Sequence, residues 1–215
     1  PFFAVNGRCP ERHVALVVDE WGVWLKPNEG TETMFLQQQN SLRDALAAVV
    51  NLNIFARHSD RVRMTNIAQM VNVLQAMIMT EGSDMVLTPT YHVYKMYVPF
   101  QDATFLPLDF NAGTYVAGNI TLPRVDAIAA RGTDGHVYLS LSNLDPQDAV
   151  ELRVRVPGVN ARRAVGEVLT AERVDSINTF ADPDAVEPEA YTARAVNGEL
   201  VLRLLQLVRR HALGL

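Results

Sequence analysis

Two carboxylates and two tryptophans stand close together near the start of the chain, at Asp19, Glu20, Trp21 and Trp24. A carboxylate can act as a nucleophile or exchange a proton, and an indole offers a flat apolar face to a substrate. The four residues follow the apolar run from His13 to Val18, which is typical of a parallel strand buried on both faces. In barrels and open α/β sheets the carboxyl ends of such strands face the pocket, so these side chains are candidates for an active site.

The two adjacent carboxylates are a poor acid/base pair. If the strand continues through them, Asp19 and Glu20 point to opposite faces, so at most one reaches a pocket and the other supports it. Taken alone, an acidic pair after a strand is more often a helix cap or a solvated loop, and tryptophan is a common core residue. An apolar ring beside a carboxylate nevertheless suits a sugar, whose C–H faces are apolar and whose hydroxyls need polar partners.

A second polar cluster, from Thr65 to Asn72, follows the second predicted strand, Val62 to Ile67. It includes Gln69. Neutral amides at such a position can hold hydroxyl groups by hydrogen bonds without adding a competing charge. Most amides in loops only bond nearby backbone groups, so this cluster is a weaker candidate than the first.

The elements predicted around these residues change character along the chain. A long amphipathic helix is predicted over Glu32 to about Arg57, between the two strands, which is the spacing of a βαβ crossover. A further helix is predicted over Thr90 to Tyr97. After about Ala103, period-two alternation and Asn-Gly and Asp-Gly turns predict an antiparallel sandwich. Its strands are expected near residues 103–110, 124–131, 136–142, 149–156, 164–170 and 199–204. We therefore divide the chain into an α/β part, residues 1–98, and an all-β part, residues 99–215.

Composition excludes several classes of partner. The net charge of −5 and the low charged content of 20% give no basic surface for nucleic acid. The longest apolar run, Ala45 to Val50, is far shorter than the roughly 20 residues of a membrane helix. One cysteine, Cys9, and five scattered histidines predict neither a disulfide nor a metal site, and no glycine-rich phosphate loop is present, so no cofactor is expected.

The start of the chain predicts a segment from within a longer protein, because it opens at Pro1 without an initiator methionine. No basic stretch followed by a long apolar stretch marks a signal peptide. We therefore expect a cytoplasmic protein.

Four segments together carry a resemblance to a known family. They are Val17 to Trp24 (VVDEWGVW), Ala56 to Gly82, Thr88 to Tyr97 and Ile177 to Pro188 (INTFADPDAVEP). In these segments the chain resembles the C-terminal half of the α-L-arabinofuranosidases of glycoside hydrolase family 51. The resemblance implies the C-terminal part of a (β/α)8 barrel followed by a jelly-roll-like β-sandwich. The chain departs from the family pattern at Leu205 to Leu215, a segment that is more like a short basic helix.

The resemblance also implies roles for single residues. Glu20 matches the nucleophile at the end of barrel strand seven, Gln69 an amide that holds arabinose hydroxyls at the end of strand eight, and Trp24 an aromatic residue of the sugar pocket. Asp19 and Trp21 match the motif in supporting roles. The acid/base of the family lies on strand four, so the N-terminal remainder of the barrel is required as a partner. A homo-oligomer is also implied.

The expected function is that of a retaining, exo-acting α-L-arabinofuranosidase. Its substrates would be terminal non-reducing α-L-arabinofuranosyl residues of arabinoxylan, arabinan and arabino-oligosaccharides. Two alternatives stay open. One is a related endo-glucanase or xylosidase, and the other is an inactive fragment that acts as a carbohydrate-binding or oligomerisation module.

Overall fold

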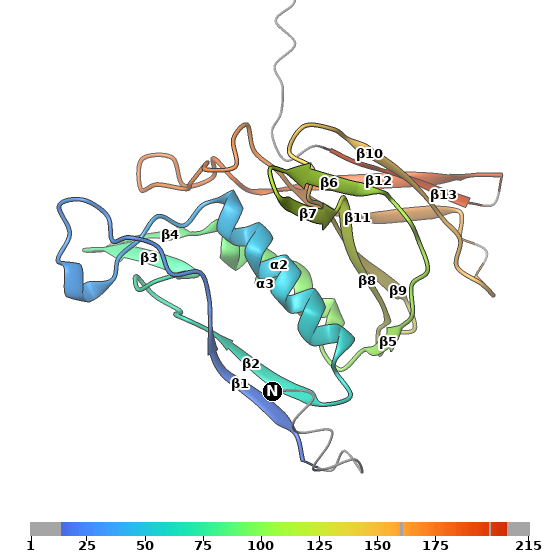
Figure 1. Ribbon diagram of the computed structural model, residues 1–215, viewed down its shortest axis with the longest axis horizontal. Helices are drawn as coiled ribbons and strands as arrows, with labels where there is room; N and C mark the ends of the chain where they lie inside the picture. The colour runs from blue at the N-terminus through green and yellow to red at the C-terminus, as the bar shows by residue number, and fades with distance from the viewer. Residues whose placement is uncertain (1–13, 160, 198, 206–215) are drawn as a thin grey trace, which may run out of the picture.

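The computed structural model describes residues 14–159, 161–197 and 199–205 (Figure 1). Its first part is built on two parallel strands joined by a helix, as the sequence predicts. The elements are β1 (Leu16–Trp21), the short helix η1 (Thr33–Phe35), α2 (Leu42–Arg57) and β2 (Val62–Ile67). A helical crossover between parallel strands is the usual way to bring their carboxyl ends to one edge.

Two predicted boundaries in this part are wrong. β1 does not end before Asp19 but continues to Trp21, which pairs with Ile67 and accepts a hydrogen bond from the backbone N–H of Ala68. The long helix does not begin near Glu32. It begins after Ser41, because the carboxylate of Asp44 accepts hydrogen bonds from both the backbone N–H and the hydroxyl of Ser41, which is the capping arrangement of a helix start.

The chain then forms a hairpin and a second helix. The hairpin was not predicted and consists of β3 (Ile78–Glu81) and β4 (Asp84–Leu87). α3 (Pro89–Tyr97) confirms the second predicted helix, with Pro89 in the first turn, where its missing N–H costs nothing, and it leads into η2 (Val98–Phe100). α2 and α3 pack on each other through small and branched apolar side chains, among them Ala45, Ala48 and Val93. No helix among the described residues is long and apolar enough to cross a lipid bilayer.

The second part is an antiparallel β-sandwich, as predicted. One sheet has the order β5 (Thr104–Leu106), β8 (Val125–Arg131), β9 (Val137–Asn143). The other has the order β10 (Val150–Val154), β13 (Glu199–Leu204), β12 (Pro188–Val196), β11 (Arg163–Leu169). The predictions missed β12 and the small hairpin of β6 (Thr114–Ala117) and β7 (Ile120–Pro123), and the first predicted sandwich strand shrinks to β5.

The alternation of side chains explains the core of the sandwich. Leu141 of β9, Leu152 of β10 and Leu202 of β13 point between the two sheets, where they pack with the buried Val125 and Ala193. On β10 the residues on either side of Leu152, Glu151 and Arg153, are polar and exposed, which is typical of an antiparallel sheet with one wet face. The other face of β9 is instead covered, and Ser140 on it contacts Tyr97 of α3.

The two parts share more than a linker. In Figure 1, α2 and α3 lie between the β1–β2 pair and the sandwich. The connection between β11 and β12, residues 170–187, returns to the helices and adds Ala171 and Val186 to their core. The division of the chain between residues 98 and 99 stays a prediction. The connection between β11 and β12 belongs to the second part by that division, and yet it completes the core of the first part. The basic helix predicted for residues 205–215 lies outside the described residues except for Leu205.

Candidate active site

A β-bulge places the acidic pair. Between the paired positions Val18↔Thr65 and Trp21↔Ile67, β1 advances by three residues and β2 by two, so β1 carries one extra residue at Asp19 and Glu20. A bulge bends the strand and re-aims a side chain, and bulges are common beside active sites. The simple alternation expected from the sequence therefore does not apply across this pair.

Glu20 lines a concavity of about 300 Å³ at the carboxyl end of β1. Its other walls come from Trp24 and neighbouring residues of the same loop and from the loop after β2; the lining is Glu20, Trp21, Gly22, Val23, Trp24, Ala68 and Leu74. Asp19 is exposed but does not line it. One carboxylate of the pair thus reaches the concavity, together with an indole that is 68% exposed and available to a ligand.

Gln69 follows Ala68, which lines the concavity, at the carboxyl end of β2. Its side chain is exposed, and its backbone N–H donates to Val73 O. The peptide bond between Ala68 and Gln69 is cis. The loops after the two strands approach closely, because a Cβ on Gly22 would lie 3.1 Å from Ala68 O. Parallel pairing therefore brings the three predicted site residues, Glu20, Trp24 and Gln69, to the same edge.

Trp21 has a different environment from Trp24. Its ring contacts Phe55 of α2 edge-on at 5.4 Å and stacks with Tyr94 of α3 at 6.5 Å. Burial raises the pKa of the Tyr94 hydroxyl, so this ring stays neutral at any physiological pH. Trp21 is therefore a packing residue that fixes the end of β1 against the helices.

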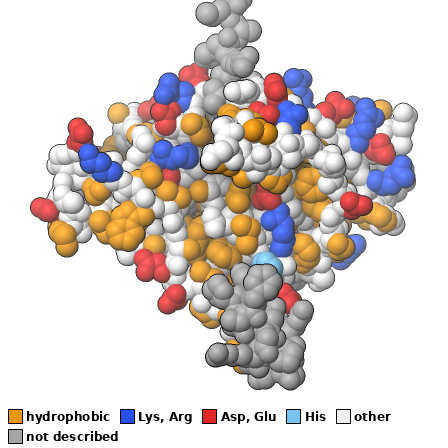
Figure 2. Space-filling model, viewed as in Figure 1, with side chains coloured by type: hydrophobic (Ala, Val, Ile, Leu, Met, Phe, Trp, Pro, Cys, Tyr) orange, Lys and Arg blue, Asp and Glu red, His pale blue; other side chains and the backbone are white. Residues whose placement is uncertain are grey.

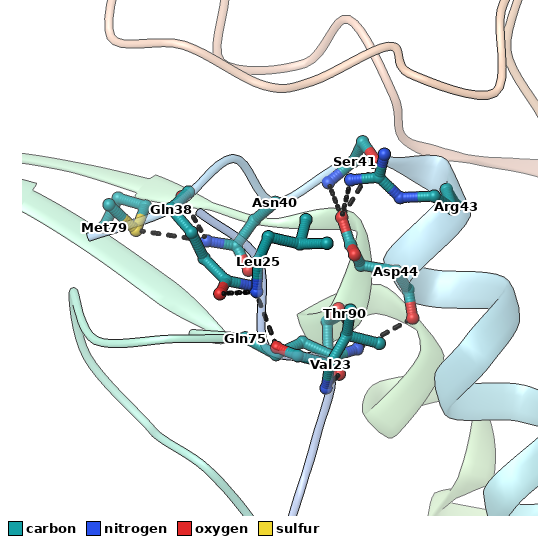
Figure 3. A network of polar contacts seen from close by, with 10 residues as sticks. All are labelled: Val23, Leu25, Gln38, Asn40, Ser41, Arg43, Asp44, Gln75, Met79 and Thr90. Carbon is teal, nitrogen blue, oxygen red and sulfur yellow. Dashed lines mark hydrogen bonds and ion pairs between the residues drawn. The ribbon is translucent and has the colours of Figure 1, made fainter. Parts of the chain in front are cut away.

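Sequence reasoning missed two buried glutamines beneath the Trp24 loop, Gln38 and Gln75 (Figure 3). Gln75 Oε1 accepts from Val23 N at 2.8 Å, and Gln38 Oε1 accepts from Leu25 N at 2.8 Å. Gln38 Nε2 also donates to Val23 O at 3.0 Å. Gln38 stands in a run of three glutamines, and nothing in that run marks which one is buried.

A larger concavity of about 490 Å³ lies elsewhere, on the connection between β11 and β12. Its polar lining is hydroxyls and carboxylates, including Asp182, Asp184 and Glu187, with no aromatic ring and no side-chain amide. None of the predicted site residues lines it. Across the described part of the chain, no three or more His, Cys, Asp or Glu side chains form a group that could hold a metal ion. The smaller concavity is the one that joins a carboxylate to an aromatic surface.

Comparison with known proteins identifies the family. The sequence profile described as "Alpha-L-arabinofuranosidase C-terminal domain" matches residues 19–206. The crystal structure of the family 51 arabinofuranosidase from Xanthomonas axonopodis pv. citri superposes with a TM-score of 0.91 at 50% identity. The chain belongs to the α-L-arabinofuranosidases of glycoside hydrolase family 51. The resemblance carried by the four sequence segments is thereby confirmed.

The family 51 relatives extend beyond the region that this chain covers. The superposition covers 96% of this chain and 42% of the Xanthomonas protein. An intracellular exo-α-L-arabinofuranosidase of Bacteroides ovatus is 44% identical over 188 residues, which are 87% of this chain and 37% of that protein. The family 51 α-L-arabinofuranosidase of Thermotoga petrophila is 25% identical, with a TM-score of 0.77. The chain thus spans about two fifths of the length of these relatives.

Proposed function

We propose that this chain supplies the nucleophile and part of the sugar pocket of a retaining, exo-acting α-L-arabinofuranosidase. The observation that carries the proposal is the position of Glu20, which alone of the acidic pair lines a concavity shared with Trp24. The family membership gives this concavity its substrate class. Terminal non-reducing α-L-arabinofuranosyl residues of arabinoxylan, arabinan and arabino-oligosaccharides are the proposed substrates.

The chemistry proposed for Glu20 is attack on the anomeric carbon. A new C–O bond forms between the carboxylate and the sugar while the glycosidic C–O bond breaks, and the departing oxygen takes a proton from a second carboxylic acid. Water then cleaves the glycosyl ester, so the configuration is retained. Trp24 offers its ring to the apolar face of the sugar, and the amide of Gln69 holds a sugar hydroxyl.

The second carboxyl group is proposed to come from the remainder of the barrel. A retaining mechanism needs it about 5 to 5.5 Å from the nucleophile. The Asn-Glu dipeptide of this chain, Asn28–Glu29, does not fit that role, because it lies in an exposed turn and does not line the concavity.

The exposed face of the β1–β2 pair supports the same proposal. Val17 and Met64 are register partners, and each is 52% exposed. A pair of apolar side chains on a parallel sheet is normally covered. We propose that β1 and β2 are the last two strands of a (β/α)8 barrel, whose other strands cover this face. A cytoplasmic location is proposed by analogy with the intracellular Bacteroides relative, and the homo-oligomer stays a prediction.

Replacing Glu20 tests the proposal, in the protein expressed from the complete open reading frame that encodes this chain. We expect Glu20→Gln to lower kcat/KM on an aryl α-L-arabinofuranoside by at least about a thousandfold, because the covalent step is lost. The matched control is Asp19→Asn, the adjacent carboxylate outside the concavity, which should retain activity within about tenfold. Glu20→Gln activity within a few-fold of the parent would refute the assignment.

A second measurement reads the chemistry directly. In Glu20→Ala, azide fits the space left by the carboxylate and can attack the anomeric carbon in its place. We expect azide to restore turnover and to give an arabinosyl azide of inverted configuration, seen by NMR. Product analysis on arabinoxylan and on β-glucan separates an exo-arabinofuranosidase, which releases arabinose, from an endo-glucanase or xylosidase.

A further inference from the structure

The loop that carries Trp24 has no strand neighbour to bond with. Residues 22–28 belong to no helix or strand. Backbone N–H and C=O groups in a partly buried segment still need partners, and a loop without them would sample many conformations. The partners here are the side chains of Gln38 and Gln75, which bond the residues on both sides of Trp24.

The two glutamines are suited to this because they are buried and fully oriented. Gln38 is 1% exposed and Gln75 is 0% exposed. A backbone N–H can only donate, so each Oε1 must face it, and each Nε2 is then directed to an acceptor. Gln75 Nε2 donates to Asp44 O at 2.7 Å and to Thr90 Oγ1 at 3.1 Å.

The contacts of Gln75 link the loop to the helices. Asp44 lies in the first turn of α2, and Thr90 lies in the first turn of α3 (Figure 3). One side chain therefore fixes the Trp24 loop to the starts of both helices. Gln38 provides a second attachment on the other side of the loop, from the segment just before α2.

The indole itself takes no part in these contacts. Hydrophobic side chains are exposed at the surface of the molecule (Figure 2), and Trp24 is among the most exposed of them. A large aromatic ring in water is usually mobile, and a mobile ring loses conformational entropy when a ligand stacks on it. Rigid backbone on both sides reduces that cost in advance.

We propose that Gln38 and Gln75 are positioning residues that pre-organise Trp24 for the sugar. The inference rests on the proposed function, since it assumes that Trp24 contacts the substrate. It predicts that losing either glutamine weakens substrate binding through Trp24 and leaves the covalent step almost unchanged.

The test replaces each glutamine by methionine, which has a similar length and no hydrogen-bonding amide, with the exposed neighbour Gln39→Met as the matched control. In protein labelled with 5-fluorotryptophan, the Trp24 signal is assigned by its absence in Trp24→Phe. We expect this signal to shift and broaden in Gln38→Met and Gln75→Met and to stay unchanged in Gln39→Met. A Trp24 signal that is unmoved in both buried variants overturns the inference.

Kinetics add a readout that a general loss of stability would not give. We expect each buried variant to raise KM about tenfold with kcat within about threefold. In a Trp24→Ala background the same replacements should change KM less than about twofold. If the glutamines act through Trp24, their effect on KM is lost once the indole is absent, so the effects of the two replacements are not additive. Equal effects of the glutamine variants with and without Trp24 would overturn the inference.

One measurement needs no variant of the glutamines. In the parent protein, the backbone amides of Val23 and Leu25 should exchange with deuterium as slowly as strand amides, and exchange at the rate of an open loop contradicts the inference. This result and the fluorine spectra do not depend on catalysis. If Glu20→Gln kept full activity, the proposed function would fail while these two measurements still decided the role of the glutamines.

Discussion

Asn178 offers a quantitative test of how the connection between β11 and β12 supports α2 and α3. Its side chain makes three hydrogen bonds: Nδ2 donates to Leu87 O at 2.8 Å and to Val186 O at 3.0 Å, and Oδ1 accepts from Val186 N at 2.7 Å. It thereby attaches the β11–β12 connection to the end of β4. Val186, held in this way, is completely buried among the side chains of α2 and α3.

Asn178→Ala removes all three bonds and leaves their backbone partners unsatisfied. At about 0.5 to 1.5 kcal/mol net for each bond, the free energy of unfolding should fall by about 3 kcal/mol. For a protein of this size, about 1 kcal/mol corresponds to roughly 2 to 4 °C in Tm. We therefore expect Tm to fall by about 6 to 12 °C.

Calorimetry measures this change, and Asn111→Ala is the control. Asn111 is exposed and accepts one hydrogen bond from Gly113 N, so its replacement should cost less than about 1 kcal/mol. Hydrogen exchange locates the effect: the amides of Leu42 and Arg43, which donate to Ser176 O and Val174 O, should exchange faster in Asn178→Ala. A decrease in Tm of less than about 2 °C in Asn178→Ala would refute this account of the connection.

Two further predictions concern the same region. Tyr97→Phe removes a hydroxyl that lies 2.6 Å from both Asn53 Oδ1 and Ser140 Oγ, and should lower the free energy of unfolding in urea by about 1 to 3 kcal/mol; an unchanged urea midpoint would contradict a contribution from this contact. Burial, with help from Lys95, lowers the pKa of His92 below its ordinary 6.5, against the opposing carboxylates Glu187, Asp184 and Glu167. As the pH falls, His92 is therefore protonated in the unfolded chain before it is protonated in the folded protein. The contribution of His92 to the free energy of unfolding should be complete above about pH 6.5 and should decrease as the pH drops below that value. In His92→Phe, the difference in Tm between about pH 7.5 and about pH 5.5 should shrink, and an equal difference in both proteins would contradict the role of His92.

Local patterns predicted much of the fold. The run of apolar residues before Asp19 and the alternation around Leu141 and Leu152 are local patterns. Each can be seen in the sequence without knowing which distant segments the strand contacts. β12 escaped prediction because its inward residues Tyr191, Ala193 and Ala195 do not stand out from its outward ones, which include the apolar Ala190 and Val196.

The site was predictable only where a motif marked it. Glu20, Trp24 and Gln69 stand in segments that resemble a known family, and the structure brings all three to one edge. The bulge at Asp19 and Glu20 depends on pairing with β2, which lies more than forty residues later, so no local pattern reveals it. The burial of Gln38 and Gln75 depends on how α2 and α3 meet the loop, which is likewise a property of the tertiary structure.

The first turn of α2 has a consequence for the order in which the protein can mature. Its backbone donors at Leu42 and Arg43 find their acceptors at Ser176 and Val174, more than 130 residues further along the chain. On the ribosome, the helix emerges long before those carbonyls are synthesised. The start of α2 therefore stays without these two acceptors in the nascent chain until the connection between β11 and β12 has been synthesised.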